Sequence, residues 1–169
     1  KTDAAKKFFW MNVCVASAVL KDKKLNYAFR AQVHSDQFGE ASCTFLNEQA
    51  KARLGKDPKD LRVAIIHEDG AYGVDVAKGN EAGAKKAGLN IVMKEGYSAT
   101  APDLSALVTK LKRARPDVIF HTGYNPDITL FGRQAREQGL KFAALGGHGA
   151  GYGVYEKLKE GLGADVNYV

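Results

Sequence analysis

Two tyrosines that stand beside glycines offer the clearest chemistry in the sequence. Tyr72 lies in EDGAYG and Tyr124 lies in HTGYNP. A tyrosine ring provides an apolar wall with a hydroxyl tip, and neighbouring glycines let a small molecule approach the backbone. Thr122 and His148 also follow apolar runs and add polar side chains that can orient a ligand. The pattern predicts a site that holds a small polar molecule.

A glycine-rich segment, GGHGAGYG at residues 146–153, is the main argument for a nucleotide site. It lacks the Lys-Ser/Thr ending of a P-loop, and it comes too late in the chain for a dinucleotide-binding fingerprint. The sequence contains no G-x-S-x-G nucleophile elbow, and neither Cys14 nor Cys43 has an evident histidine partner. These observations favour a binding protein over an enzyme.

Three histidines raise the question of a metal site. His67, His121 and His148 could meet with Glu68 and Asp69, because the ends of parallel strands lie close together. No two of the histidines have the i, i+4 spacing with which a helix presents two ligands to one metal. Buried histidines with satisfied hydrogen bonds are the simpler interpretation, so we expect neither a metal nor a cofactor.

The elements that must position these residues repeat one pattern, a short apolar run followed by a polar turn and a segment of helical period. Near-continuous apolar runs are typical of parallel strands that are covered on both faces. We therefore expect an α/β fold, a doubly wound parallel sheet with helices on both faces. The expected strands cover residues 62–68, 90–95, 117–121 and 142–145, and the expected helices cover residues 36–54, 72–87, 103–111 and 125–138.

Local signals refine these elements. Asp103 and Asn125 are expected N-caps, since Asp and Asn side chains accept hydrogen bonds from the first free N–H groups of a helix. Gly79 and Gly83 would allow their helix to pack close to the sheet. The segment 146–153 is expected to be a loop, and ADVNYV at the end of the chain resembles a strand.

The composition describes a folded protein. The chain has 169 residues, 45% of them hydrophobic and 26% charged, with 18 glycines and 4 prolines. Disorder, collagen and a disulfide scaffold are thereby excluded. The formal net charge of +6 first suggests nucleic acid. The excess consists mostly of single Lys and Arg residues at helical spacing, which is typical of solvated helix faces, so we expect no nucleic-acid partner.

Three longer stretches resemble the type I periplasmic solute-binding proteins of ABC importers, of the leucine/isoleucine/valine-binding kind. Within them, the combination of D-x-x-Y-G, D-x-S-x-L-V-x-x-L and G-Y-x-P with R-Q-A-R-x-x-G-L is specific, and the resemblance covers nearly all of residues 25–169. The stretches are RVAIIHEDGAYGVDVAKG (62–79), YSATAPDLSALVTKLKRARPDVIFHTGYNPDITLFGRQAREQGLK (97–141) and YAFRAQVHSDQFGEA (27–41).

The resemblance implies a protein of two lobes that close on a ligand like a hinge. Residues 1–20 would be the end of the first lobe and the start of the hinge, residues 21–169 would be the second lobe, and most of the first lobe would be absent. The implied function is that of an exported, periplasmic receptor that delivers a small ligand to the membrane permease of an ABC importer, with its signal peptide not in this chain. A ligand-sensing or regulatory domain of the same fold is the alternative.

The resemblance also assigns site residues. Tyr72 and Tyr124 match two ligand-facing tyrosines of the family, and Ser17 is the candidate for the first lobe's contact to the ligand carboxylate. His148 falls where the family has an acidic residue that holds the ligand's ammonium group. Neutral histidine is a weaker partner for ammonium than a carboxylate is, so an aromatic or aliphatic acid would suit the site at least as well as an amino acid. Glu68 or Asp69 is the alternative source of negative charge.

Overall fold

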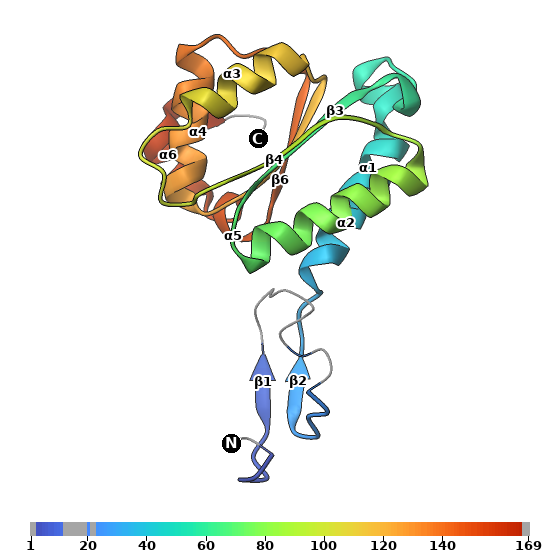
Figure 1. Ribbon diagram of the computed structural model, residues 1–169, viewed down its shortest axis with the longest axis vertical. Coiled ribbons are helices and arrows are strands. Elements are labelled where there is room, and N and C mark those ends of the chain that lie inside the picture. Colours follow the sequence, from blue (N-terminus) through green and yellow to red (C-terminus); the bar gives the residue numbers. More distant parts are fainter. Residues whose placement is uncertain (1–2, 12–19, 21–22, 167–169) are drawn as a thin grey trace.

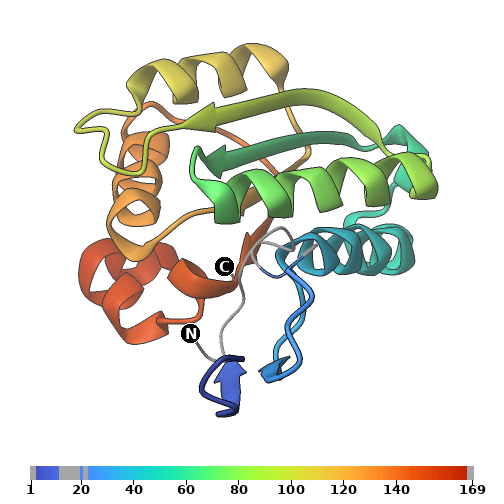
Figure 2. The same cartoon turned by 60° about the horizontal axis from the view of Figure 1, so that its bottom comes forward.

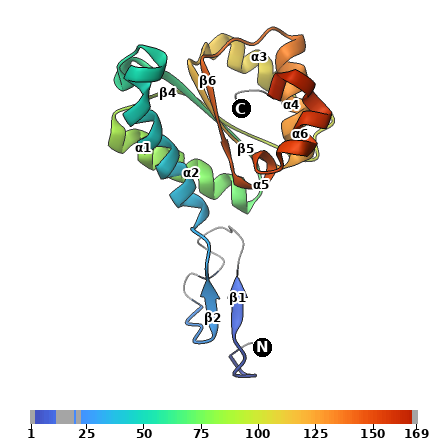
Figure 3. The ribbon, with the colours of Figure 1, turned by 180° about the vertical axis from the view of Figure 1, so that it is seen from behind.

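The computed structural model describes residues 3–11, 20 and 23–166. Its main body is a four-stranded parallel sheet in the order β4-β3-β5-β6, with helices on both sides (Figure 1). A separate ribbon of two parallel strands, β1 (Phe9–Met11) and β2 (Ala28–Arg30), extends from one end of this body, as the view from behind also shows (Figure 3). The expected α/β fold with a parallel sheet is confirmed.

The two central strands of the sheet, β3 and β5, are buried along almost their whole length. Every residue of β5 is buried, and in β3 only the first residue is exposed. Such strands form where both faces of a sheet are covered, because side chains on either face then lie in the core, and the buried polar residues stand only at the carboxyl ends of the two strands. The strands are β3 (Arg62–Glu68), β4 (Asn90–Tyr97), β5 (Val118–Thr122) and β6 (Ala144–His148).

Helices α1 and α2 cover one face of the sheet, and α3 and α4 cover the other. Successive side chains of a strand point to opposite faces. Accordingly, Ile65 packs in the core beside α1 and α2, whereas its neighbours Ala64 and Ile66 pack beside α3 and α4. The helices are α1 (Ser35–Leu54), α2 (Ala71–Ala87), α3 (Ser105–Ala114), α4 (Asn125–Glu137), α5 (Gly149–Tyr152) and α6 (Tyr155–Leu162), with short 3-10 helices η2 (Pro58–Asp60) and η3 (Gly163–Val166).

Glycines bring α1 and α2 into main-chain contact. A Cβ atom on Gly79 of α2 would overlap the carbonyl oxygen of Asp36, and one on Gly39 of α1 would overlap the carbonyl oxygen of Val76. The expectation that Gly79 and Gly83 allow α2 to pack close to the sheet is therefore wrong, because these glycines do not face the sheet. Their partner is helix α1, and Gly83 lies against Cys43, a buried free thiol.

Several element boundaries differ from those expected. Helix α3 begins at Ser105, and Asp103 Oδ1 accepts hydrogen bonds from the Ser105 amide and hydroxyl instead of capping from the position directly before the helix. Helix α4 has Tyr124 and not Asn125 at its N-cap. Strand β6 begins later than expected and extends to His148, so the first three residues of the expected glycine-rich loop are strand and the next four form helix α5. The expected strand at the end of the chain is helix η3 up to Val166.

Candidate ligand-binding site

The candidate site lies at the carboxyl ends of the parallel strands, where helices begin. Figure 2 shows β3 and β4 (greens) ending at one edge of the sheet, beside the start of α2. Tyr72 is the second residue of α2, and Tyr124 is the N-cap of α4, which follows β5. Their ring centroids are 6.0 Å apart at an interplanar angle of 42°. The structure therefore brings together the two tyrosines selected from the sequence, and Tyr124 is 42% exposed.

Glu68 holds the start of the helix that carries Tyr72. Its carboxylate is 3% exposed and accepts hydrogen bonds from the amide of Gly70 at 2.6 Å and from the amide of Gly73 at 2.5 Å. These are free N–H groups at a helix N-terminus, where a negative charge is favourable. A side chain on Gly73 would overlap the Glu68 carbonyl, which explains the glycine after Tyr72.

Asp127 does the same for the helix that begins beside Tyr124. Its Oδ1 accepts a hydrogen bond from the Tyr124 amide at 2.9 Å, and its Oδ2 accepts one from the Tyr97 hydroxyl at 2.5 Å. The side chain is 3% exposed, and this burial raises the pKa of Asp127. A Cβ on Gly123 would lie only 2.5 Å from the Tyr97 hydroxyl, so a glycine is needed there.

Thr122 and His148 lie together, but beneath the surface. They are partners in the register of β5 and β6, and they are 1% and 2% exposed. Thr122 Oγ1 is 3.0 Å from His148 Nδ1, and His148 Nε2 is 2.8 Å from the hydroxyl of Ser42 on α1. Burial lowers the pKa of His148 to about 4, which keeps the ring neutral. Both ring nitrogens of His148 therefore already have hydrogen-bond partners on β5 and α1.

His121 is the centre of a second buried chain of hydrogen bonds. Its Nε2 is 2.7 Å from the Tyr97 hydroxyl, and its Nδ1 is 2.6 Å from the hydroxyl of Tyr152 on α5. Burial lowers the pKa of His121 to about 3, with smaller effects of His148 and His67, so the imidazole is neutral. The interpretation of His67 and His121 as buried, hydrogen-bonded histidines is confirmed, since His67 Nδ1 lies 2.7 Å from the Glu68 carbonyl.

Sequence reasoning missed Tyr97, Asp127 and Tyr152 as parts of the site. Asp127 offered one usable signal, since an acidic residue in the first turn of a helix is a common capping partner. Tyr97 and Tyr152 offered none, because they reach His121 from other elements. Ser17 lies outside the described residues. Within those residues no group of three or more His, Cys, Asp or Glu side chains is placed to hold a metal ion.

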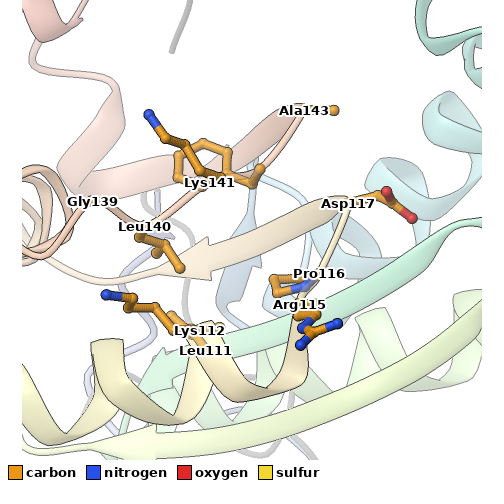
Figure 4. Close-up of a pocket in the computed structure, with 10 residues that line it drawn as sticks. Leu111, Lys112, Arg115, Pro116, Asp117, Gly139, Leu140, Lys141 and Ala143 are labelled. Atoms are coloured by element: carbon orange, nitrogen blue, oxygen red, sulfur yellow. The ribbon is translucent and has the colours of Figure 1, made fainter.

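A hollow of about 570 Å³ at the opposite, amino ends of β5 and β6 does not have the properties of a ligand site (Figure 4). The charged ends of Lys112, Arg115 and Lys141 at its wall point in different directions (Figure 4). Lys112 donates a hydrogen bond to the Gln138 carbonyl at 2.6 Å, at the end of α4, where a cation is favourable. Asp117 forms an ion pair of 2.7 Å with Lys56 of the loop before β3, so its negative charge is balanced within the protein.

None of the helices in the described part of the chain is both long enough and apolar enough to span a bilayer.

Comparisons with known proteins agree with the geometry of the fold. The protein-family model described as periplasmic binding protein matches residues 4–169. A Leu/Ile/Val-binding protein homolog 7 from Brucella suis is 39% identical over 147 residues, which are 87% of this chain and 37% of that protein. The chain therefore spans well under half the length of this relative.

Solved structures share the fold at lower identity. A leucine-binding protein from Thermotoga maritima superimposes with a TM-score of 0.77 at 23% identity, covering 98% of this chain and 43% of that one. A solute-binding protein of an ABC transporter from R. palustris, in complex with benzoate, has a TM-score of 0.65 at 14% identity and covers 80% and 35%. Since the family model matches nearly the whole chain, this chain belongs to the type I periplasmic binding proteins, a family of solute receptors and not of enzymes.

Proposed function

We propose that this chain forms the second lobe of a periplasmic receptor that captures a small carboxylate-bearing solute and presents it to the permease of an ABC importer. The observation that carries the proposal is the tyrosine pair at the carboxyl ends of the sheet, with Tyr72 and Tyr124 at the starts of the helices that follow the adjacent strands β3 and β5. In open parallel sheets, ligands bind at this edge. The names of the relatives, which include leucine-binding and benzoate-bound proteins, are consistent with such a solute.

We propose further that residues 1–20 belong to the end of a first lobe and to the hinge, and that residues 21–169 form the second lobe. The ribbon, in which β1 from the first-lobe side of the division pairs with β2 from the second-lobe side, supports a connection between two lobes at this part of the chain. Phe8, Trp10 and Phe29 stack on its surface and are 76%, 67% and 42% exposed. A contiguous exposed aromatic surface usually marks an interface. In the proposed protein, the remainder of the first lobe covers it.

Among carboxylate-bearing solutes, the electrostatics of the site favour one that turns an ammonium group toward the tyrosines. Glu68 and Asp127 are buried beneath Tyr72 and Tyr124. Burial and then these two carboxylates raise the pKa of the Tyr124 hydroxyl, so their negative field reaches the tyrosine. His148 and His121 are neutral and do not offset it. An amino acid is therefore favoured over an acid without an amino group.

The proposed contacts follow from exposure. Tyr72 and Tyr124 contact the ligand directly. Thr122 and His148 support the strand ends from below, where their polar atoms already bind one another and Ser42. Ser17 stays the candidate for the ligand's carboxylate on the side of the first lobe.

Isothermal titration of the full-length protein with L-leucine, 4-methylpentanoate and benzoate tests the proposal. 4-Methylpentanoate is leucine without its ammonium group, and we expect it to bind at least about tenfold more weakly, since a charge-assisted contact is lost. Equal binding of the two would refute the ammonium preference. Replacing Tyr124 with Ala should weaken binding while the thermal midpoint changes little, and Tyr155→Ala on the exposed face of α6 is the control. Failure of a panel of amino, aromatic and aliphatic acids to bind would overturn the receptor function.

A further inference from the structure

The hydrogen bonds of Asp127 divide between the backbone of Tyr124 and the side chain of Tyr97. One carboxylate oxygen accepts from the Tyr124 amide at 2.9 Å, and the other accepts from the Tyr97 hydroxyl at 2.5 Å. Tyr97 ends β4, and Asp127 lies in the first turn of α4, so the pair joins two elements on either side of the site. The position of the Tyr124 backbone therefore depends on where Tyr97 holds the carboxylate.

Which atom donates and which accepts in each hydrogen bond from Asp127 to Tyr152 follows from the number of protons that each side chain carries. Tyr97 has a single proton, which it donates to the Asp127 carboxylate. His121 Nε2 must then donate to the Tyr97 oxygen, and since the ring is neutral, Nδ1 accepts from Tyr152. One tautomer of His121 thus satisfies all four side chains, which is how a buried polar network becomes rigid.

Steric crowding leaves this arrangement little freedom. Tyr97, Asp127 and His121 are all buried, and His121 packs edge-on against Phe131 with ring centroids 4.7 Å apart. Gly123 lies so close to Tyr97 and Asp127 that any side chain there would displace one of them. The turn that presents Tyr124 is thus supported from below by a polar network that is closely packed against Gly123.

From this geometry we infer that Tyr97 and Asp127, oriented by His121, are positioning residues for ligand binding that act through Tyr124. The inference rests on the proposed function in one respect, namely that Tyr124 contacts the ligand. Tyr97 itself is 8% exposed and does not share the surface with Tyr124. Its hydroxyl matters for binding because it fixes the carboxylate that holds the Tyr124 amide.

A double-mutant cycle tests this inference. Tyr97→Phe removes the hydroxyl and keeps the ring, and we expect it to weaken L-leucine binding roughly 3- to 10-fold, the range for one lost hydrogen bond. In a protein that already carries Tyr124→Ala, Tyr97→Phe should weaken binding no further, because the residue through which it acts is gone. Additive losses in the double variant would overturn the inference, as would a Tyr97→Phe variant that loses thermal stability but binds normally. Tyr155→Phe is the matched control.

Amide hydrogen exchange supplies a measurement that needs no ligand. We expect the Tyr124 amide of the Tyr97→Phe variant to exchange at least about threefold faster than in the wild-type protein, while the Gly73 amide, which Glu68 holds, keeps its rate. An unchanged Tyr124 rate would overturn the positioning role even if L-leucine binds. If no carboxylate solute binds the wild-type protein, the proposed function fails, and the exchange rate still decides whether Tyr97 holds Tyr124.

Discussion

Thr122 and His148 face each other across β5 and β6, with Thr122 Oγ1 3.0 Å from His148 Nδ1. On the other side of the imidazole, the Ser42 hydroxyl, which donates to the Phe38 carbonyl, lies 2.8 Å from His148 Nε2, and the Asn80 side-chain nitrogen lies 3.4 Å from the same atom. Nδ1 also lies 3.2 Å from the His121 carbonyl, so each nitrogen of the neutral imidazole has hydrogen-bond partners within the protein. A second proton would put a positive charge on a ring that is only 2% exposed, and the loss of hydration is what lowers the pKa of His148.

Stability should therefore fall as the pH falls below neutral. Burial lowers the pKa of His148 to about 4 and that of His121 to about 3 in the folded protein, from an ordinary value of 6.5. Between pH 6.5 and about 4 the unfolded chain binds protons on both histidines and the folded chain does not. Each histidine then removes up to about 1.4 kcal/mol of unfolding free energy per pH unit. Above pH 6.5 their contribution is fully present.

Urea unfolding at pH 7.0, 6.0 and 5.0 measures this slope. The variant His148→Gln keeps a polar side chain that does not titrate, so its unfolding free energy should fall less steeply over the same range. Parallel slopes for wild type and variant would contradict the burial of a neutral His148. Comparison of the two slopes also removes the contribution of the carboxylates, which titrate in both proteins.

Gly79→Ala should be strongly destabilising, although alanine is the better helix former. A methyl group at this position overlaps the Asp36 carbonyl of α1, and the two helices must separate to admit it. We expect the overlap to lower the free energy of unfolding by about 3 kcal/mol or more, at the upper end for an overpacked core. The better helix propensity of alanine would raise it by only about 1 kcal/mol. Thermal unfolding measures the change, with the exposed neighbour Lys78→Ala as control. A variant as stable as the wild type would mean that α1 and α2 do not touch at Gly79.

The tyrosine pair could be predicted from the sequence because its signals are local. Tyr72 and Tyr124 each follow an apolar run and stand beside a glycine at the start of a helix. In a parallel sheet, all such strand ends meet at one edge, so the topology alone brings them together. The same local logic gave the strands and most of the helices.

The position of His148 could not be predicted from the sequence, because the two glycines before it are required by tertiary packing and not by a loop. Gly146 and Gly147 lie in β6, where a Cβ would fall 2.8 Å from the Phe120 ring in the first case and overlap the Tyr152 ring in the second. They are glycines because aromatic rings pack on them, and nothing local distinguishes such residues from loop glycines. Residues 146–148 of the expected loop are therefore strand, and His148 at its end contacts Ser42 of α1. The network of Tyr97 and Asp127 escaped prediction for a similar reason, since 30 residues separate its members.

Trp10 provides a direct test of the two-lobed arrangement, because it is the single tryptophan of the chain. On the ribbon it is 67% exposed and stacks on Phe29 with ring centroids 6.3 Å apart. The 169-residue chain alone should therefore emit fluorescence at the long wavelengths of a hydrated indole and be quenched readily by acrylamide. Produced together with a complete first lobe that has no other tryptophan, Trp10 should emit at shorter wavelength and resist quenching, since the first lobe covers the ribbon and removes water from the indole. The variant Phe45→Trp, on the exposed face of α1 and far from the ribbon in sequence, serves in a Trp10→Phe background as the control whose emission stays the same in both proteins. If Trp10 is equally quenched in both proteins, the ribbon is not covered and the proposal that the first lobe packs on it is wrong.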